Sequence, residues 1–193
     1  AHFIMSIFTH FRKKGLGNTK IELAFRKFAK EVISKAKQNL NRAKKGGGNL
    51  EKSLQYKLEI SSGGSLSLDM LADFYADFVD KGVSGTEKRR MMVKLDGSRK
   101  KSPYSYTSKR PPASVFSKWI IKKGLKGSRD KNGRFVSRKS MQFAIAESIY
   151  KRGIKASPFF TNAFRESFTN MDQKIVEAFA LDIAKMLTTM NIK

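Results

Sequence analysis

The stretch from Ser140 to Phe164 constrains the fold more than any other part of the chain. Apolar residues recur at helical spacing along its first half, and Gly153 stands where such a helix would end in a left-handed cap. Pro158 suits the first turn of a second helix. The inward-facing residues would be Phe143, Ile145, Ala146, Ile149 and Tyr150 in the first helix, and Phe159, Phe160, Ala163 and Phe164 in the second. The stretch therefore predicts two amphipathic helices packed through a short turn.

The N-terminal half predicts a long helix followed by a β-hairpin. Thr19 and Glu22 have the spacing of a capping box, and apolar residues follow at helical spacing until Gly46, so we expect a helix over residues 19–45. Apolar and polar residues then alternate over residues 53–71, interrupted by a Ser-Ser-Gly-Gly turn. This alternation is typical of a hairpin with one buried face.

The rest of the chain predicts several shorter elements. The helical spacing that follows the hairpin predicts a helix that stops at Gly82. Alternation near residues 91–95, followed by Asp-Gly, favours either a hairpin excursion or a partly mobile loop. A helix that carries Trp119 is expected to end at Gly124, and residues 171–190 predict a closing amphipathic helix.

Together these elements predict an α+β fold. The hairpin at 53–71, extended by the strand near 91–95 if the two pair, would form a small antiparallel sheet covered by several amphipathic helices. Residues 1–18 would be an N-terminal basic arm, and residues 19–193 a single domain with a basic loop insertion at 83–110. The side chains expected in the core include Trp119, Phe143, Ile149 and Phe160.

The net charge of +24 is concentrated in two blocks. Residues 1–50 carry +10 and residues 83–140 carry +15, whereas residues 51–82 carry −3 and residues 141–193 carry +2. Charge of this size disfavours a compact isolated chain through self-repulsion, so it predicts an anionic partner. Nucleic acid and acidic protein surfaces both fit this requirement.

Composition argues against metal and disulfide chemistry. The chain has no cysteine, and its two histidines, His2 and His10, lie in the N-terminal arm, so neither a structural zinc site nor any cofactor is expected. The apolar run near the N-terminus lacks the length and the basic flank of a signal peptide or membrane span. We expect a soluble protein made in the cytoplasm, without a membrane partner.

Three patterns could carry enzyme chemistry, and each has a simpler explanation. The glycines at 15–17 and 46–48 lack the glycine-lysine-hydroxyl order of a P-loop and suit helix boundaries. Ser84 lacks the glycine spacing of a nucleophile elbow. Four aspartates would share one face of a helix, and a solvated face explains them without a bound Mg²⁺. They are Asp69, Asp73, Asp77 and Asp80. We therefore expect no enzymatic activity.

The basic insertion supplies the candidate assembly or DNA-contact residues. They are Lys88, Arg89, Arg90, Lys94, Arg99, Lys100, Lys101, Lys109 and Arg110. Tyr104 and Tyr106 stand among them, and this mixture suits phosphate contacts with occasional base stacking, although solvated loops share it. No helix-turn-helix, zinc-finger or RNA-recognition signature accompanies these residues, so any contact with duplex DNA would be non-specific.

Three segments carry a resemblance to a known family. They read GNLEKSL at 48–54, YADFVDKG at 75–82, and SMQFAIAESIYKRGIKASPFFTNAF at 140–164. In this order they resemble the HK97 gp10-like neck and tail-completion proteins of tailed bacteriophages. The resemblance covers roughly Thr19 to Phe164. The chain departs from the family in its strong positive charge and in the length of its 83–110 insertion.

The resemblance implies a structural virion protein. Copies would form a homo-oligomeric ring in the neck, between the portal or adaptor and the tail proteins, and would complete the head-tail joint around the DNA channel. Made in the host cytoplasm, the protein would reside in the virion. A non-specific DNA-binding or packaging protein is the alternative from another class. A phage nuclease is a third reading, and the lack of a carboxylate constellation argues against it.

Overall fold

The computed structural model describes residues 9–10, 19–60, 65–125, 127, 129, 131–169 and 171–190. The chain forms two compact units. The first comprises Ala1–Asp80, Lys94–Ser98 and Ser157–Lys193, and the second comprises Lys81–Val93 and Arg99–Ala156. The basic insertion thus belongs to the second unit apart from its turn. That residues 19–193 act as one domain stays a prediction.

Helix α1 (Lys20–Arg42) is the central element of the first unit and confirms the predicted long helix. The Thr19 hydroxyl accepts a hydrogen bond from the Glu22 amide at 3.1 Å, as a capping box requires. The Glu22 carboxylate pairs with Arg26 at 2.7 Å, an interaction within the helix. The buried apolar face of α1 consists of Ile21, Phe25, Phe28, Ala29, Val32, Ala36 and Leu40.

The predicted hairpin is confirmed as strands β2 (Gln55–Ile60) and β3 (Ser65–Leu71), which pair antiparallel with Leu58 opposite Leu68. The two-residue strand β1 (Thr9–His10) pairs with the other edge of β3, so the sheet order is β1-β3-β2. A short helix, α2 (Asn49–Ser53), stands directly before β2, where the sequence indicated only the entry into a strand. The sheet turns the buried side chains of Leu66, Leu68 and Met70 toward the core.

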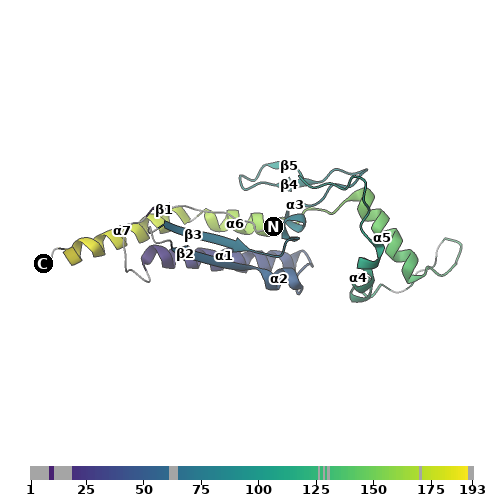
Figure 1. Cartoon of the computed structure of the whole chain (residues 1–193), viewed down its shortest axis with the longest axis horizontal. Helices are drawn as coiled ribbons and strands as arrows, with labels where there is room; N and C mark the ends of the chain where they lie inside the picture. The colour runs from purple at the N-terminus through teal and green to yellow at the C-terminus, as the bar shows by residue number, and fades with distance from the viewer. Residues whose placement is uncertain are drawn as a thin grey trace. The chain divides into compact units, whose positions relative to one another are not determined.

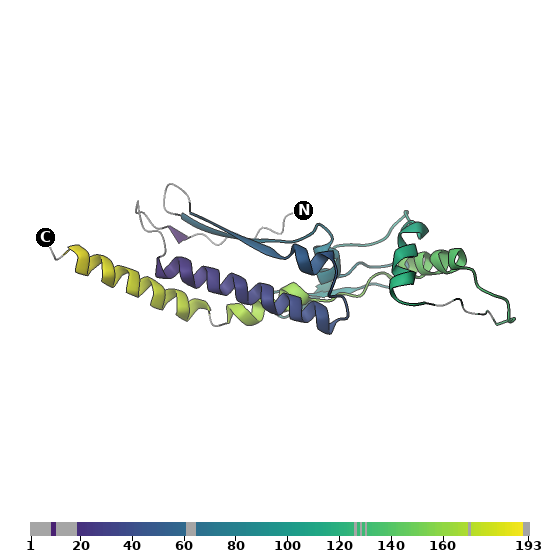
Figure 2. The same ribbon diagram turned by 90° about the horizontal axis from the view of Figure 1, so that it is seen from below.

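Helices α6 (Phe159–Phe168) and α7 (Met171–Met190) complete the first unit. Figure 2 shows α1 between the β2-β3 hairpin and these two helices. The ring of Phe28 meets that of Phe164 edge-on, with 5.5 Å between centroids. The predicted inward face of α6 is confirmed, since Phe159, Ala163 and Phe164 are buried and Phe160 is half-buried. Both helices were expected from their periodicity.

The second unit is built on helices α4 (Phe116–Lys122) and α5 (Arg138–Arg152), with a 3₁₀ turn at Ala113–Val115 that leads into α4 (Figure 1). Strands β4 (Met91–Val93) and β5 (Arg99–Lys101) form an antiparallel ribbon. Of the two expectations for this insertion, the hairpin excursion is therefore confirmed. The ribbon is a separate sheet, so the proposed extension of the 53–71 hairpin is wrong.

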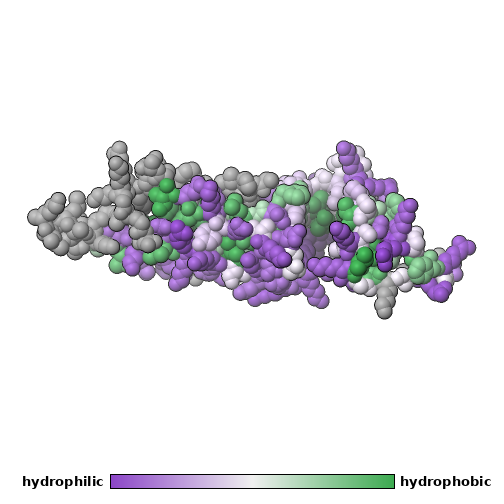
Figure 3. All heavy atoms as spheres, turned by 60° about the horizontal axis from the view of Figure 1, so that its bottom comes forward, coloured by the Kyte–Doolittle hydropathy of each residue, from purple (hydrophilic) through white to green (hydrophobic). Residues whose placement is uncertain are grey.

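The predicted core is wrong at two positions in the second unit. Trp119 is 45% exposed and Phe143 is 58% exposed, whereas Ile149 is half-buried. The residues that α4 and α5 bury most are instead Ile120 and Ala146. Helical spacing identifies a stripe of side chains but not whether a neighbouring element covers it. On the face shown in Figure 3, hydrophobic atoms lie among hydrophilic ones over the α4-α5 part of this unit.

Candidate functional site

Asp80 lies in the last turn of α3 (Ala76–Lys81), and its carboxylate accepts three hydrogen bonds in the first unit. It is 5% exposed, and its carboxylate accepts hydrogen bonds from the amides of Phe160 at 2.8 Å and Thr161 at 3.2 Å. The Thr161 hydroxyl donates a third. These are first-turn groups of α6, where free amides and the helix dipole favour a negative charge. Burial nevertheless raises the pKa of Asp80, and the hydrogen bonds from Thr161 and Phe160 oppose that rise.

Two further hydrogen bonds join the segments around Asp80. The Ser157 amide donates to the Val79 carbonyl at 2.9 Å, and the Asp73 amide donates to the Ser53 hydroxyl at 3.0 Å. Helix α3 is therefore tied to the chain before α6, and the loop before α3 is tied to the end of α2. Within the first unit, the end of α2 is thus joined to the loop before α3, and α3 is joined to the start of α6.

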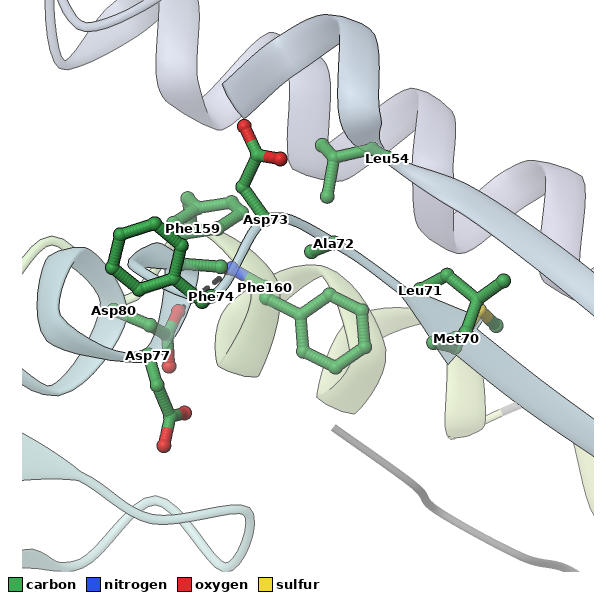
Figure 4. A pocket seen from close by; sticks show the side chains of 11 residues that line it. Leu54, Met70, Leu71, Ala72, Asp73, Phe74, Asp77, Asp80, Phe159 and Phe160 are labelled. Carbon is green, nitrogen blue, oxygen red and sulfur yellow. Dashed lines mark hydrogen bonds between the residues drawn. The ribbon is translucent and has the colours of Figure 1, made fainter. Parts of the chain in front are cut away.

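An apolar pocket opens beside these contacts (Figure 4). Its lining comprises Leu54, Met70, Leu71, Ala72, Asp73, Phe74, Ala76, Asp77, Asp80, Phe159 and Phe160. The Phe74 side chain is 69% exposed. Asp73 and Asp77 lie to either side of the aromatic rings in the close-up. The pocket thus combines an apolar floor with a partly acidic rim.

The four aspartates do not share a helix face, so that prediction is wrong. Asp69 lies on β3, Asp73 lies in the loop that follows, and only Asp77 and Asp80 belong to α3. Asp80 is buried and hydrogen-bonded, which also contradicts a solvated face at that position. Within the described ranges, no three His, Cys, Asp or Glu side chains form a group that could hold a metal ion. The end of β3 and the loop that follows it separate Asp69 and Asp73 from α3, which a count of helical spacing does not reveal.

In the second unit, the chain after α3 crosses the end of α5 at close range. Val83 and Ile154 exchange backbone hydrogen bonds of 2.9 and 2.8 Å. Gly153 has φ +69°, and a Cβ atom there would stand 2.1 Å from the Val83 carbonyl oxygen. A Cβ on Gly85 would stand 2.1 Å from the Lys151 carbonyl oxygen. The close approach therefore requires glycine in both segments, at Gly85 and at Gly153.

Ser84, which lacks the sequence signature of a nucleophile elbow, is a structural residue of this crossing. It is 2% exposed, and its hydroxyl accepts a hydrogen bond from the Arg90 amide at 3.0 Å. Its own amide donates to the Tyr104 carbonyl, and its carbonyl accepts from the Tyr106 amide, both at 2.8 Å. Ser84 thus anchors the chain on both sides of the β4-β5 ribbon.

The structure brings most of the candidate basic residues onto the β4-β5 ribbon and the chain leading to it. Arg99, Lys100 and Lys101 are all exposed on β5. Lys88 and Arg89 are exposed, whereas the Arg90 guanidinium donates to the Arg152 carbonyl at 2.8 Å. Lys94 lies in the ribbon turn. An exposed row of cations on a short ribbon can meet phosphates or carboxylates.

Lys109 and Arg110 lie outside the ribbon strands; Lys109 is exposed, and Arg110 contacts α5. Arg110 pairs with Glu147 at 2.9 Å and stands over the Tyr150 ring at 5.5 Å from its centroid. Tyr106 is half-buried against Tyr150, with 6.3 Å between ring centroids, and burial raises its pKa. Neither Tyr106 nor Arg110 is therefore a free platform for stacking bases.

Sequence reasoning missed two surfaces: the pocket beside Phe74 and an exposed stripe on α4. The stripe consists of Val115, which directly precedes α4, and of Lys118, Trp119 and Lys122 within α4. Their spacing of three, four and seven residues is visible in the sequence, but it predicted a core position for Trp119. The pocket had no such signal, because Leu54, which follows α2, lines it together with residues from β3, the loop after β3, α3 and α6.

The chain matches no model of a known protein family, no curated protein and no solved structure at a significant level. Among the described helices, none is both long enough and apolar enough to cross a membrane. The function is therefore inferred from the sequence motifs of the chain and from the contacts that the residues of these motifs make.

Proposed function

We propose that the chain is a structural virion protein of a tailed bacteriophage, which forms part of the head-tail connector ring around the DNA channel. One observation supports this most. Asp80, from the YADFVDKG segment, caps the helix that begins in the PFF segment by bonding Phe160 and Thr161. Segments that carry the resemblance, although about eighty residues apart, are thus direct structural partners.

The charge distribution supports the same proposal. The exposed cations on β5 suit a position against the DNA in a channel or against acidic subunits of the portal, adaptor or tail. A connector subunit needs no turnover chemistry, and we propose none. Ser84 is buried in its crossing, and Asp80 is occupied by the start of α6.

The alternative is a non-specific DNA-binding or packaging protein, and the exposed basic ribbon favours it. A titration of duplex-DNA affinity against salt separates the two proposals. A dedicated binder that neutralises about six phosphates would lose affinity steeply, with a slope of about −5 in a plot of log affinity against log salt concentration. A connector subunit that meets DNA only as part of a ring would bind weakly and with a shallow slope as a free protein.

The proposed function is tested by removing the gene from the phage that encodes the chain. We expect DNA-filled heads and separate tails to accumulate, and joined particles to return when the wild-type chain is supplied in trans. Empty heads would favour the packaging alternative. Normal infectious particles would contradict both.

A further inference from the structure

The exposed stripe on α4 has the properties of a binding surface. Val115 is 59% exposed and Trp119 is 45% exposed, and Lys118 and Lys122 stand beside them on the same face. The opposite face of α4 is anchored by Ile120, which is fully buried. Tryptophan is one of the side chains enriched in the hot spots near the centre of protein interfaces. The stripe therefore offers an apolar centre with two flanking positive charges.

The pocket of the first unit offers the complementary chemistry. Its floor is apolar, Phe74 at its edge is 69% exposed, and the carboxylates of Asp73 and Asp77 flank the rings (Figure 4). It lies mostly within residues 51–82, which carry three basic and six acidic side chains in a chain of net charge +24. An apolar side chain with adjacent cations is the ligand that such a pocket would favour.

We propose that the α4 stripe of one copy docks into the Phe74 pocket of a second copy, with Lys118 and Lys122 facing Asp73 and Asp77. This inference rests on the proposed ring and names the surfaces that would build it. The two surfaces differ, so the contact is head-to-tail and leaves an unused pocket on the first copy and an unused stripe on the second. Such contacts continue from copy to copy until a ring closes.

Charge is the reason for choosing a second copy as the occupant. Copies that each carry +24 repel one another, so a contact between them must involve the acidic part of at least one copy. The pocket is an apolar surface located in that part. The stripe supplies the opposite charge together with large apolar side chains, which is the combination that stabilises and orients an interface.

Two variants that each block one surface test the proposal. The stripe variant carries Lys118→Glu and Trp119→Ser, and the pocket variant carries Phe74→Ser and Asp77→Lys. All four side chains are exposed or half-buried, and circular dichroism checks that each variant folds. As a matched control, Phe135→Ser removes another aromatic side chain, 70% exposed, from the same unit as the stripe.

Sedimentation of each full-length chain over a range of concentrations gives the readout. We expect the wild type and the Phe135→Ser control to associate alike, and each blocked variant alone to associate at least about tenfold more weakly. An equimolar mixture of the blocked variants should form a dimer and nothing larger, because only one intact stripe and one intact pocket remain per pair. A wild type that stays monomeric, or blocked variants that associate as it does, would overturn the proposal.

Cysteine cross-linking identifies the contact directly, since the chain has no cysteine of its own. A chain with Trp119→Cys and a differently tagged chain with Phe74→Cys should form a mixed disulfide when combined. A chain that carries both substitutions and cross-links only to itself would overturn docking between copies. These outcomes need no phage, so a protein absent from virions would refute the proposed function while leaving the self-association result intact.

Discussion

The carboxylate of Asp80 accepts a hydrogen bond from the backbone amide of Phe160 across 2.8 Å, and so joins α3 to the first turn of α6. Asp80→Ala removes this acceptor and leaves the amides of Phe160 and Thr161 without their partner. We expect a loss of about 3 kcal/mol in the free energy of unfolding, because a buried donor is left unpaired. Urea denaturation followed by circular dichroism measures it. Asp69→Ala on β3, half-buried, is the control and should cost under about 1 kcal/mol.

The ionisation of Asp80 should give stability a distinct pH dependence. Burial raises the pKa of this carboxyl above its ordinary value of 3.8. The folded protein therefore holds the Asp80 proton more tightly than the unfolded chain does. At a pH between the unfolded-state and folded-state pKa of Asp80, the folded protein binds more protons. The stability contributed by this group is present in full below pH 3.8 and is lost as the pH rises through the folded-state pKa.

Asp80→Asn, which does not titrate, isolates this effect. We expect the free energy of unfolding of the wild type, minus that of Asp80→Asn, to decrease as the pH rises from below 3.8 toward neutrality. Urea denaturation at a series of pH values gives this difference. A difference that grows with pH would show that hydrogen bonding outweighs burial at Asp80.

Gly153→Ala should open the crossing in the second unit. The new Cβ would collide with the Val83 carbonyl oxygen, at 2.1 Å, and would occupy a backbone with φ +69°. We expect a cost of more than about 3 kcal/mol, seen as faster amide exchange at Val83 and Ile154. Gly124→Ala is the matched control, because Gly124 has φ +62° with open space around it. It should cost only about 1 to 2 kcal/mol, and an equal effect of the two substitutions would refute the close approach.

Truncation of two large aromatic side chains should lower stability by very different amounts. Phe164 is 4% exposed and packs against Phe28, so Phe164→Ala should cost about 3 to 5 kcal/mol. Trp119 is 45% exposed, and Trp119→Ala should cost under about 1.5 kcal/mol. Thermal and urea unfolding of the two variants provide the comparison. A Trp119→Ala variant as unstable as Phe164→Ala would restore the core position that the sequence predicted for this residue.

Periodicity predicted most of the architecture. The long helix, the hairpin, and helices α5, α6 and α7 follow from apolar spacing over ten or more residues, or from clean alternation in a strand pair. Gly153 and Pro158 marked their boundaries because only certain residues tolerate those backbone positions. Local chemistry therefore accounts for the elements themselves.

Tertiary relationships account for the failures. Nothing in the spacing of the four aspartates distinguishes Asp80, whose partners lie eighty residues away in α6. The apolar stripes of Trp119 and Phe143 predict core positions, yet no element in the described part of the chain covers these two side chains. The exposed α4 stripe and the Phe74 pocket, on which the proposed interface depends, could be recognised only once burial was known.

The basic ribbon should act in assembly and not in folding. Replacing six cations by serine removes charge from exposed or half-buried positions, so the fold should persist while incorporation into virions falls sharply. The six are Lys88, Arg89, Arg90, Arg99, Lys100 and Lys101. We also expect residues 88–110 to exchange amide hydrogens rapidly in the free protein and slowly in particles, apart from anchored amides such as Tyr106. Normal incorporation of the variant into virions would show that the segment is only solvent-exposed and has no role in assembly.

The location of the protein in purified particles decides whether it is a subunit of the connector ring. A tag at the C-terminus, detected by gold labelling in electron micrographs and counted by quantitative mass spectrometry, gives position and copy number together. We expect several copies per particle, all at the junction between head and tail. Particles without the protein, or label distributed through the DNA-filled head, would contradict a role as a subunit of the connector ring.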